Sequence, residues 1–143
     1  MNLETLEQYS GIAANIEALK EEINALYVPI SSPNGHTGEG HGSTPGSPTE
    51  RAAMRIVQLK ENLEYQTEQM LNMREEIETW LVTVTDTEIQ AIIRWRYLIP
   101  NREGRPRTWK DVNLKVYGYP DHWYSRNRIK RYLEKEKEEK NVT

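Results

Sequence analysis

The chain has 143 residues, no cysteine, no phenylalanine and a formal net charge of −3. Its length allows one domain of ordinary size, or a helical arm joined to a small domain, and excludes two full globular domains. The lack of cysteine excludes a disulfide framework and a thiolate zinc site. A hydrophobic fraction of 36% is low for a thick core, so we expect elongated helices and an all-α fold.

The two halves of the chain carry opposite charge. Residues 1–85 contain 13 acidic and 5 basic side chains, whereas residues 86–133 contain 5 acidic and 11 basic ones. This asymmetry indicates a polyanionic partner for the C-terminal half. No apolar run reaches the roughly 20 residues that span a bilayer, and the first residues, MNLETLEQYSG, are acidic where a secretory signal is basic. We therefore expect a cytoplasmic protein without a membrane partner.

A first arm helix is predicted within residues 1–27, because apolar side chains recur there at spacings of three and four. Residues 28–48 are rich in Gly, Pro and Ser and are predicted to form a flexible linker. His36 and His41 of this segment have no third ligand on a rigid element, so the pattern favours a solvated linker over a metal site.

A second helix is predicted over residues 49–83, where apolar residues hold a heptad register through about four repeats. The first helix can fold back against it as an antiparallel hairpin or coiled coil. Because the first helix is shorter, part of the heptad seam, the apolar stripe of the second helix, is expected to remain uncovered and to pack against a second copy of the chain. The pattern therefore predicts a homo-oligomer, a dimer or tetramer. The alternative is a monomer with an intramolecular hairpin. The predicted oligomerisation residues are Ile56, Leu59, Leu63, Gln66, Met70, Met73, Ile77 and Trp80.

Residues 84–134 are predicted to form a helix-turn-helix domain, followed by a charged tail over residues 135–143. Thr85 and Glu88 have the spacing of a capping box, which predicts a helix that begins there and ends before Pro100. A loop with three arginines, at positions 102, 105 and 107, follows it.

A short helix after this loop is predicted to begin at a Thr108 cap and to end at Gly118, the residue best suited to a left-handed conformation. The final helix should bury Ile129 and Leu133 and expose a basic and aromatic face. Such side chains bond phosphates and base edges. The predicted DNA-binding residues are Arg105, Arg107, Lys110, Trp123, Tyr124, Asn127, Arg128, Lys130 and Arg131.

An alternative assigns this face a structural role. Trp123 and Tyr124 would then complete the core, and the arginines would form salt bridges to the acidic arm.

Three stretches carry a family resemblance: AAMRIVQLKENLEYQTEQMLNMREEIE, TDTEIQAIIRWRYL and TWKDVNLKVYGYPDHWYSRNRIKRYLEK. Together they resemble phage and prophage late-gene regulators of the RinA/ArpU type, whose C-terminal part is similar to the fourth region of sigma-70-type factors. The resemblance implies a bacteriophage activator of late or packaging genes that binds specific double-stranded DNA in the bacterial host cytoplasm, with host RNA polymerase as a further partner. The link IPNREGRPRTW is longer and richer in arginine than the usual link of that family.

Other functions remain open. A small terminase subunit or packaging adaptor also combines a helix-turn-helix with oligomerising helices. A phage inhibitor of a host system would act through the arm alone. Enzyme activity and a cofactor are not expected, because the segment GEGHG lacks the strand and the Lys-Ser/Thr pair of a phosphate loop.

Overall fold

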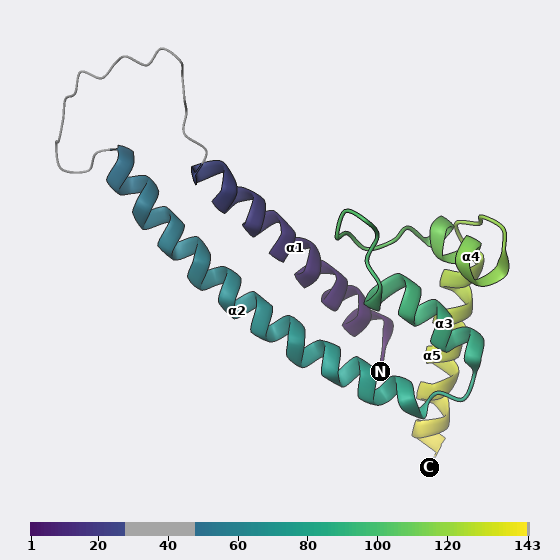
Figure 1. Ribbon diagram of the computed structural model, residues 1–143. Coiled ribbons are helices and arrows are strands. Elements are labelled where there is room, and N and C mark those ends of the chain that lie inside the picture. The colour runs from purple at the N-terminus through teal and green to yellow at the C-terminus, as the bar shows by residue number, and fades with distance from the viewer. Residues whose placement is uncertain (28–47, 143) are drawn as a thin grey trace. The chain divides into compact units, whose positions relative to one another are not determined.

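The computed structural model describes residues 1–27 and 48–142, and all regular structure in these two ranges is helical. The prediction of an all-α fold is confirmed. The described residues divide into an arm unit, residues 15–68, and a main unit, which combines residues 1–14 with the chain from residue 69 onward. Figure 1 shows the elements in chain order: α1 (Leu3–Tyr27), α2 (Pro48–Thr83), α3 (Thr87–Ile93), the π-helical segment η2 (Arg94–Leu98), α4 (Trp109–Tyr117) and α5 (Tyr124–Val142).

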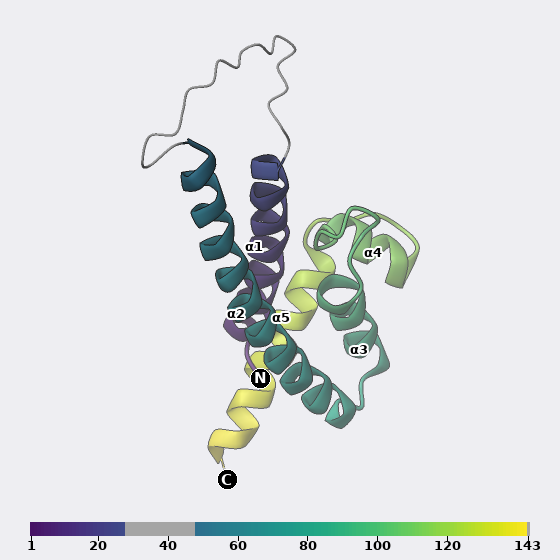
Figure 2. The ribbon, with the colours of Figure 1, turned by 60° about the vertical axis from the view of Figure 1, so that its left-hand side comes forward.

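In the arm unit, α1 and α2 lie side by side (Figure 2). They bury a small apolar cluster between them. Leu19 and Ile23 of α1 pack with Leu59 of α2, and all three are almost fully buried. The exposed side chains Arg55 and Glu22 form an ion pair at 3.2 Å beside this cluster. The spacing of the apolar residues predicted these helices, and their bounds differ from the expected ones by at most a few residues.

The heptad seam of α2 is partly covered within a single chain. Leu59 belongs to the arm cluster and Ile77 to the core of the main unit. Packing within one chain therefore accounts for part of the seam, and the second copy stays a prediction. Of the eight predicted oligomerisation residues, Leu59 and Ile77 are buried, whereas Ile56, Leu63, Gln66, Met70, Met73 and Trp80 are half-buried.

We expect Leu59→Ala to lower the free energy of unfolding of the arm by about 2 kcal/mol without changing the molecular mass in solution. The lost contacts are with Leu19 and Ile23 of the same chain. Circular dichroism during urea denaturation measures the stability, and light scattering measures the mass. A mass that falls by a whole number of subunits in the variant would contradict the intramolecular packing.

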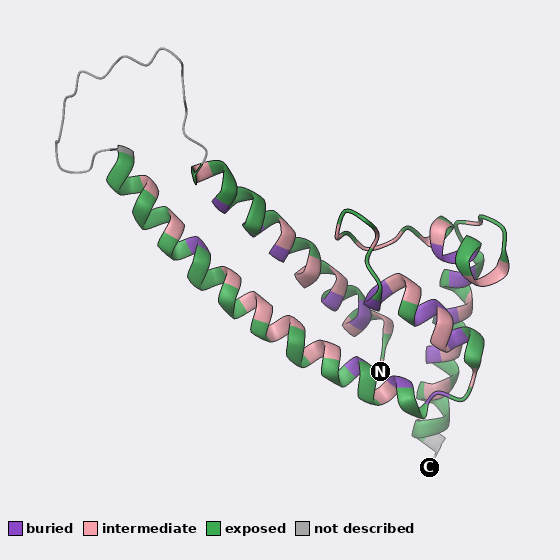
Figure 3. Cartoon of the chain, viewed as in Figure 1, coloured by how far each residue is buried: buried purple, intermediate pink, exposed green. Residues whose placement is uncertain are grey.

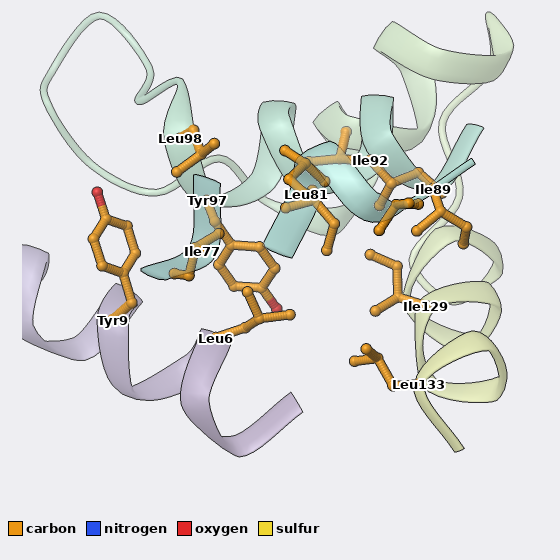
Figure 4. Close-up of a cluster of buried hydrophobic side chains, with 13 residues drawn as sticks. Leu6, Tyr9, Ile77, Leu81, Ile89, Ile92, Tyr97, Leu98, Ile129 and Leu133 are labelled. Carbon is orange, nitrogen blue, oxygen red and sulfur yellow. The ribbon is translucent and has the colours of Figure 1, made fainter. Parts of the chain in front are cut away.

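The core of the main unit is built from distant parts of the chain (Figure 4). The first turns of α1 contribute Leu6 and the end of α2 contributes Leu81. The predicted domain over residues 84–134 is therefore incomplete, because its apolar face needs residues from both arm helices. Figure 3 shows buried positions on the helices of this unit. The buried cluster consists of Leu6, Tyr9, Ile77, Leu81, Val84, Ile89, Ile92, Ile93, Tyr97, Leu98, Val112, Ile129 and Leu133.

Capping side chains set the ends of the shorter helices. Asp86, and not the expected Thr85, caps α3, because its carboxylate accepts the backbone N–H groups of Glu88 at 3.0 Å and Ile89 at 3.2 Å. The prediction for α4 is confirmed: the Thr108 hydroxyl accepts the backbone N–H of Asp111 at 3.1 Å.

The ends of α4 and of the segment before it have clear backbone causes. Gly118 ends α4 in the left-handed region with φ 86°, as predicted. Helix formation before Pro100 stops at Leu98, because Ile99 is extended. The segment that follows α3, η2 (Arg94–Leu98), is π-helical, which the sequence pattern did not predict.

Two further predictions concern the ends of segments. The final helix was expected to run into the charged tail over residues 135–143, and α5 continues through it to Val142. The predicted linker over residues 28–48 lies outside the described residues except for Pro48, which begins α2.

In the described ranges, none of the helices combines the length and the apolar character that crossing a membrane requires.

Candidate nucleic-acid interface

A buried polar network joins α4 to α5. Asn113 is fully buried on α4, and its side-chain amide donates to the carbonyl oxygen of Tyr119 in the turn at 2.9 Å. The hydroxyl of Ser125, in the first turn of α5, donates to the Asn113 side-chain oxygen at 2.7 Å. Both polar ends of the amide are satisfied, so the network holds the turn and the start of α5 in one arrangement.

The start of α5 is further fixed by Asp121. Its carboxylate accepts the backbone N–H groups of Trp123 at 2.7 Å and Tyr124 at 2.8 Å. These hydrogen bonds to the charged form lower the pKa of Asp121 below its ordinary value. Gly118, Asp121 and the Asn113 network together orient the first turns of α5 relative to α4.

The first turns of α5 expose the aromatic and polar face that the helical periodicity predicts. Trp123 is 61% exposed and Tyr124 47% exposed, while Ser125 and Ile129 are buried on the opposite side. The ring of Tyr124 meets Tyr117 edge to face with centroids 5.0 Å apart, so the exposed ring has a defined orientation. The alternative in which Trp123 and Tyr124 complete the core is wrong.

Arg128 differs from the other predicted cations because carboxylates hold its guanidinium. Its Nη2 lies 3.0 Å from the carboxylate of Asp86 and 2.8 Å from that of Glu88. Its Nε also donates to the hydroxyl of Tyr117 at 3.1 Å. The ion pairs that the structural alternative expects for the arginines therefore exist for Arg128, but their partners lie at the start of α3 and not on the arm.

This ion-pair cluster shifts the pKa values of Asp86 and Arg128 in the stabilising directions. Burial by itself would raise the pKa of Asp86, but the hydrogen bond from Ile89 N–H and the charge of Arg128 lower it below its ordinary value. Burial by itself would lower the pKa of Arg128, but the hydrogen bonds to Tyr117 and Glu88 and the charge of Asp86 raise it. Asp86 and Arg128 are therefore charged at neutral pH.

Arg107 is also engaged within the fold. Its Nη1 lies 2.8 Å from the carboxylate of Asp111, its Nε donates to the Ile99 carbonyl at 3.1 Å, and its guanidinium lies 5.0 Å from the Trp95 ring centroid. Arg107 thus fixes the arginine-rich loop to α4. It is largely shielded, with 17% of its side chain exposed, so it is a poor candidate for a DNA contact.

The loop before α4 is an ordered turn. The side-chain oxygen of Asn101 accepts the backbone N–H groups of Glu103 and Arg105, each at 2.9 Å. Gly104 adopts φ 77°, which favours glycine at this position. The side chain of Arg105 is exposed on this turn, and that of Lys110 is exposed in the first turn of α4.

A polar groove of about 600 Å³ runs beside α5. Four predicted DNA-binding residues line it, whereas Lys130 lines a different groove, together with Met1 and Leu133. The structure therefore gathers only part of the predicted set. The groove is lined by Thr85, Asp86, Tyr124, Asn127, Arg128, Arg131, Tyr132, Lys135, Glu136 and Glu139.

Sequence reasoning missed several residues of this region. Lys135 could have been found, because it continues the spacing of four from Asn127 and Arg131. Nothing local in the sequence marks Asn113, whose role depends on a contact with Ser125 across the turn.

Within residues 1–27 and 48–142, no three acidic or histidine side chains gather into a group that could hold a metal ion. His36 and His41 lie outside the described residues. Compared with protein-family models, with curated proteins and with solved structures, the chain has no match.

Proposed function

We propose that the protein binds double-stranded DNA through α4, the turn and the exposed face of α5, which act as a helix-turn-helix with α5 as the recognition helix. A transcriptional regulator is the function that this arrangement supports best. The resemblance to phage late-gene regulators adds the further proposal that the genes are late or packaging genes of a bacteriophage.

The observation that carries the proposal is the exposed face at the start of α5. Trp123, Asn127 and Arg131 are exposed there, and in the described part of the chain no ion pair or side-chain hydrogen bond occupies them. An exposed tryptophan gives up little hydration when it contacts DNA sugars or bases. Asn hydrogen-bonds adenine edges, and Arg hydrogen-bonds phosphates as well as guanine edges. A rigid support is also required for readout, and the buried Asn113 network supplies it.

Charge supports the same partner. The stretch from residue 86 to residue 133 carries a clear excess of basic over acidic side chains. Cations that meet DNA phosphates release condensed counterions, so binding through such a surface weakens as salt rises. Arg128 and Arg107 are left out of the proposed contact set, because their guanidinium groups are held by carboxylates within the fold.

We expect the paired substitution Trp123→Ala with Arg131→Ala to weaken duplex binding. It should also reduce the slope of log affinity against log salt by about 0.9, because one phosphate contact is lost. A mobility-shift titration at several salt concentrations, with a duplex of mixed sequence, measures both quantities.

The matched control is Met54→Ala with Arg51→Ala, which removes one exposed apolar and one exposed basic side chain from α2. This control should bind as the wild type does. Duplex binding that is equally affected by both pairs, or a wild-type protein that does not bind duplex DNA, would contradict the proposal.

A further inference from the structure

The groove beside α5 extends beyond the segment in which DNA contacts were expected. Asn127, Arg131 and Lys135 all line it and follow one another at a spacing of four, so they lie on one stripe of the helix. We propose that Arg131 and Lys135 together hold a phosphate group of the DNA backbone in this groove, with Arg128 as a positioning residue. This inference rests on the proposed function.

The carboxylates of the groove are mostly compensated within the fold. Asp86 is paired with Arg128 at 3.0 Å. Glu136 accepts the indole N–H of Trp80 at 3.0 Å and lies 3.8 Å from the ammonium group of Lys140. These two acidic side chains therefore contribute little net negative charge to the groove.

Two cations of the groove, Arg131 and Lys135, are not compensated in this way. Over the described ranges, no carboxylate lies within ion-pair distance of Arg131 or Lys135, and both side chains are exposed. Glu139 is the remaining acidic side chain of the lining. Side chains four residues apart on a helix are neighbours, about 6 Å apart at Cβ, so both cations can reach one phosphate or two adjacent ones.

Arg128 makes this arrangement possible without itself facing a phosphate. Its guanidinium is placed between Asp86, which lines the groove, and Glu88, two carboxylates that would otherwise repel DNA more strongly. Its Nε–H is shared between Glu88 and the Tyr117 hydroxyl at the end of α4. Arg128 therefore reduces the charge of the two carboxylates from −2 to −1 and holds α5 against α3 and α4.

The test compares Lys135→Ala with Lys137→Ala in duplex titrations from 50 to 200 mM salt. Lys137 is an exposed lysine on the same helix but lines the other groove, beside Met1, so it matches the loss of charge. We expect Lys135→Ala to reduce the salt slope by about 0.9, which is about a 3.5-fold smaller loss of affinity over this salt range. Lys137→Ala should leave the slope unchanged.

Two outcomes separate this inference from the proposed function. An unchanged slope for Lys135→Ala, together with a reduced slope for Arg131→Ala, would overturn the phosphate site and leave DNA binding intact. A wild-type protein that binds no duplex would overturn both.

The positioning role of Arg128 has its own test. Arg128→Met should weaken binding, because it leaves Asp86 and Glu88 uncompensated. Adding Asp86→Asn and Glu88→Gln should restore the affinity, since Asn also caps helices and both uncompensated carboxylates are removed. A triple variant that binds as weakly as Arg128→Met, at the same melting temperature as wild type, would show that Arg128 itself contacts DNA and would overturn the role.

Discussion

Leu6→Ala is expected to lower the free energy of unfolding of the main unit by about 3–5 kcal/mol. Leu6 is fully buried and belongs to the same cluster as Ile77, Ile89 and Ile129, although these residues lie far away in the sequence. Removing its side chain leaves a cavity in this core. A single change in the first turn of α1, at its fourth residue, would thus destabilise the proposed DNA-binding helices.

Tryptophan fluorescence during urea denaturation measures this effect well, because all four tryptophans lie in the main unit, at positions 80, 95, 109 and 123. The control is Val82→Ala, which removes an apolar side chain that is 79% exposed in the same unit and should cost less than about 0.5 kcal/mol. Equal urea midpoints for Leu6→Ala and Val82→Ala would show that residues 1–14 are not part of this core.

Asn113→Asp is expected to destabilise the main unit by about 3 kcal/mol or more at neutral pH. The buried amide donates to the Tyr119 carbonyl and accepts from Ser125. An ionised carboxylate in its place can still accept from Ser125, but it meets the Tyr119 carbonyl oxygen with no proton to donate. A protonated carboxyl group can make both hydrogen bonds.

The variant's stability should therefore depend on pH in one direction. Burial raises the pKa of the introduced carboxyl group in the folded state above its unfolded value of about 3.9. The folded state then binds more protons than the unfolded state between these two pKa values. Stability is nearly that of wild type below about pH 4 and falls by up to about 1.4 kcal/mol per pH unit as pH rises toward the folded-state pKa.

Urea denaturation at a series of pH values, relative to wild type, measures this dependence. Asn72→Asp, at an exposed position of α2 in the same unit, should show no such dependence. If the free energy of unfolding of Asn113→Asp lies below that of wild type by the same amount at every pH, the result would contradict the buried hydrogen-bond network.

Much of the fold could be predicted because its signals are local. The spacing of apolar residues determines α1 and α2. The Thr108 hydroxyl caps the start of α4, and Gly118, which adopts the left-handed conformation, ends it. The exposed face of α5 was predicted for the same reason, since the period of a helix separates Trp123 and Asn127 from Ser125 and Ile129.

The partners of each buried surface could not be predicted in this way. A heptad seam specifies that α2 must be covered, but not whether a second chain or the same chain covers it. A formal charge specifies that Arg128 is cationic, but not that Asp86 and Glu88 come within 3.0 Å of it. Both questions depend on contacts between residues that are distant in the sequence.

The sequence by itself thus determined the helical class, the positions of the helices and the basic, aromatic character of the start of α5. Only the tertiary structure decided that residues 1–14 complete the core of the main unit, and which cations of α5 remain unpaired at its surface. The physical reason is that helix formation depends on neighbours within a turn or two, whereas burial and ion pairing depend on which helices pack together.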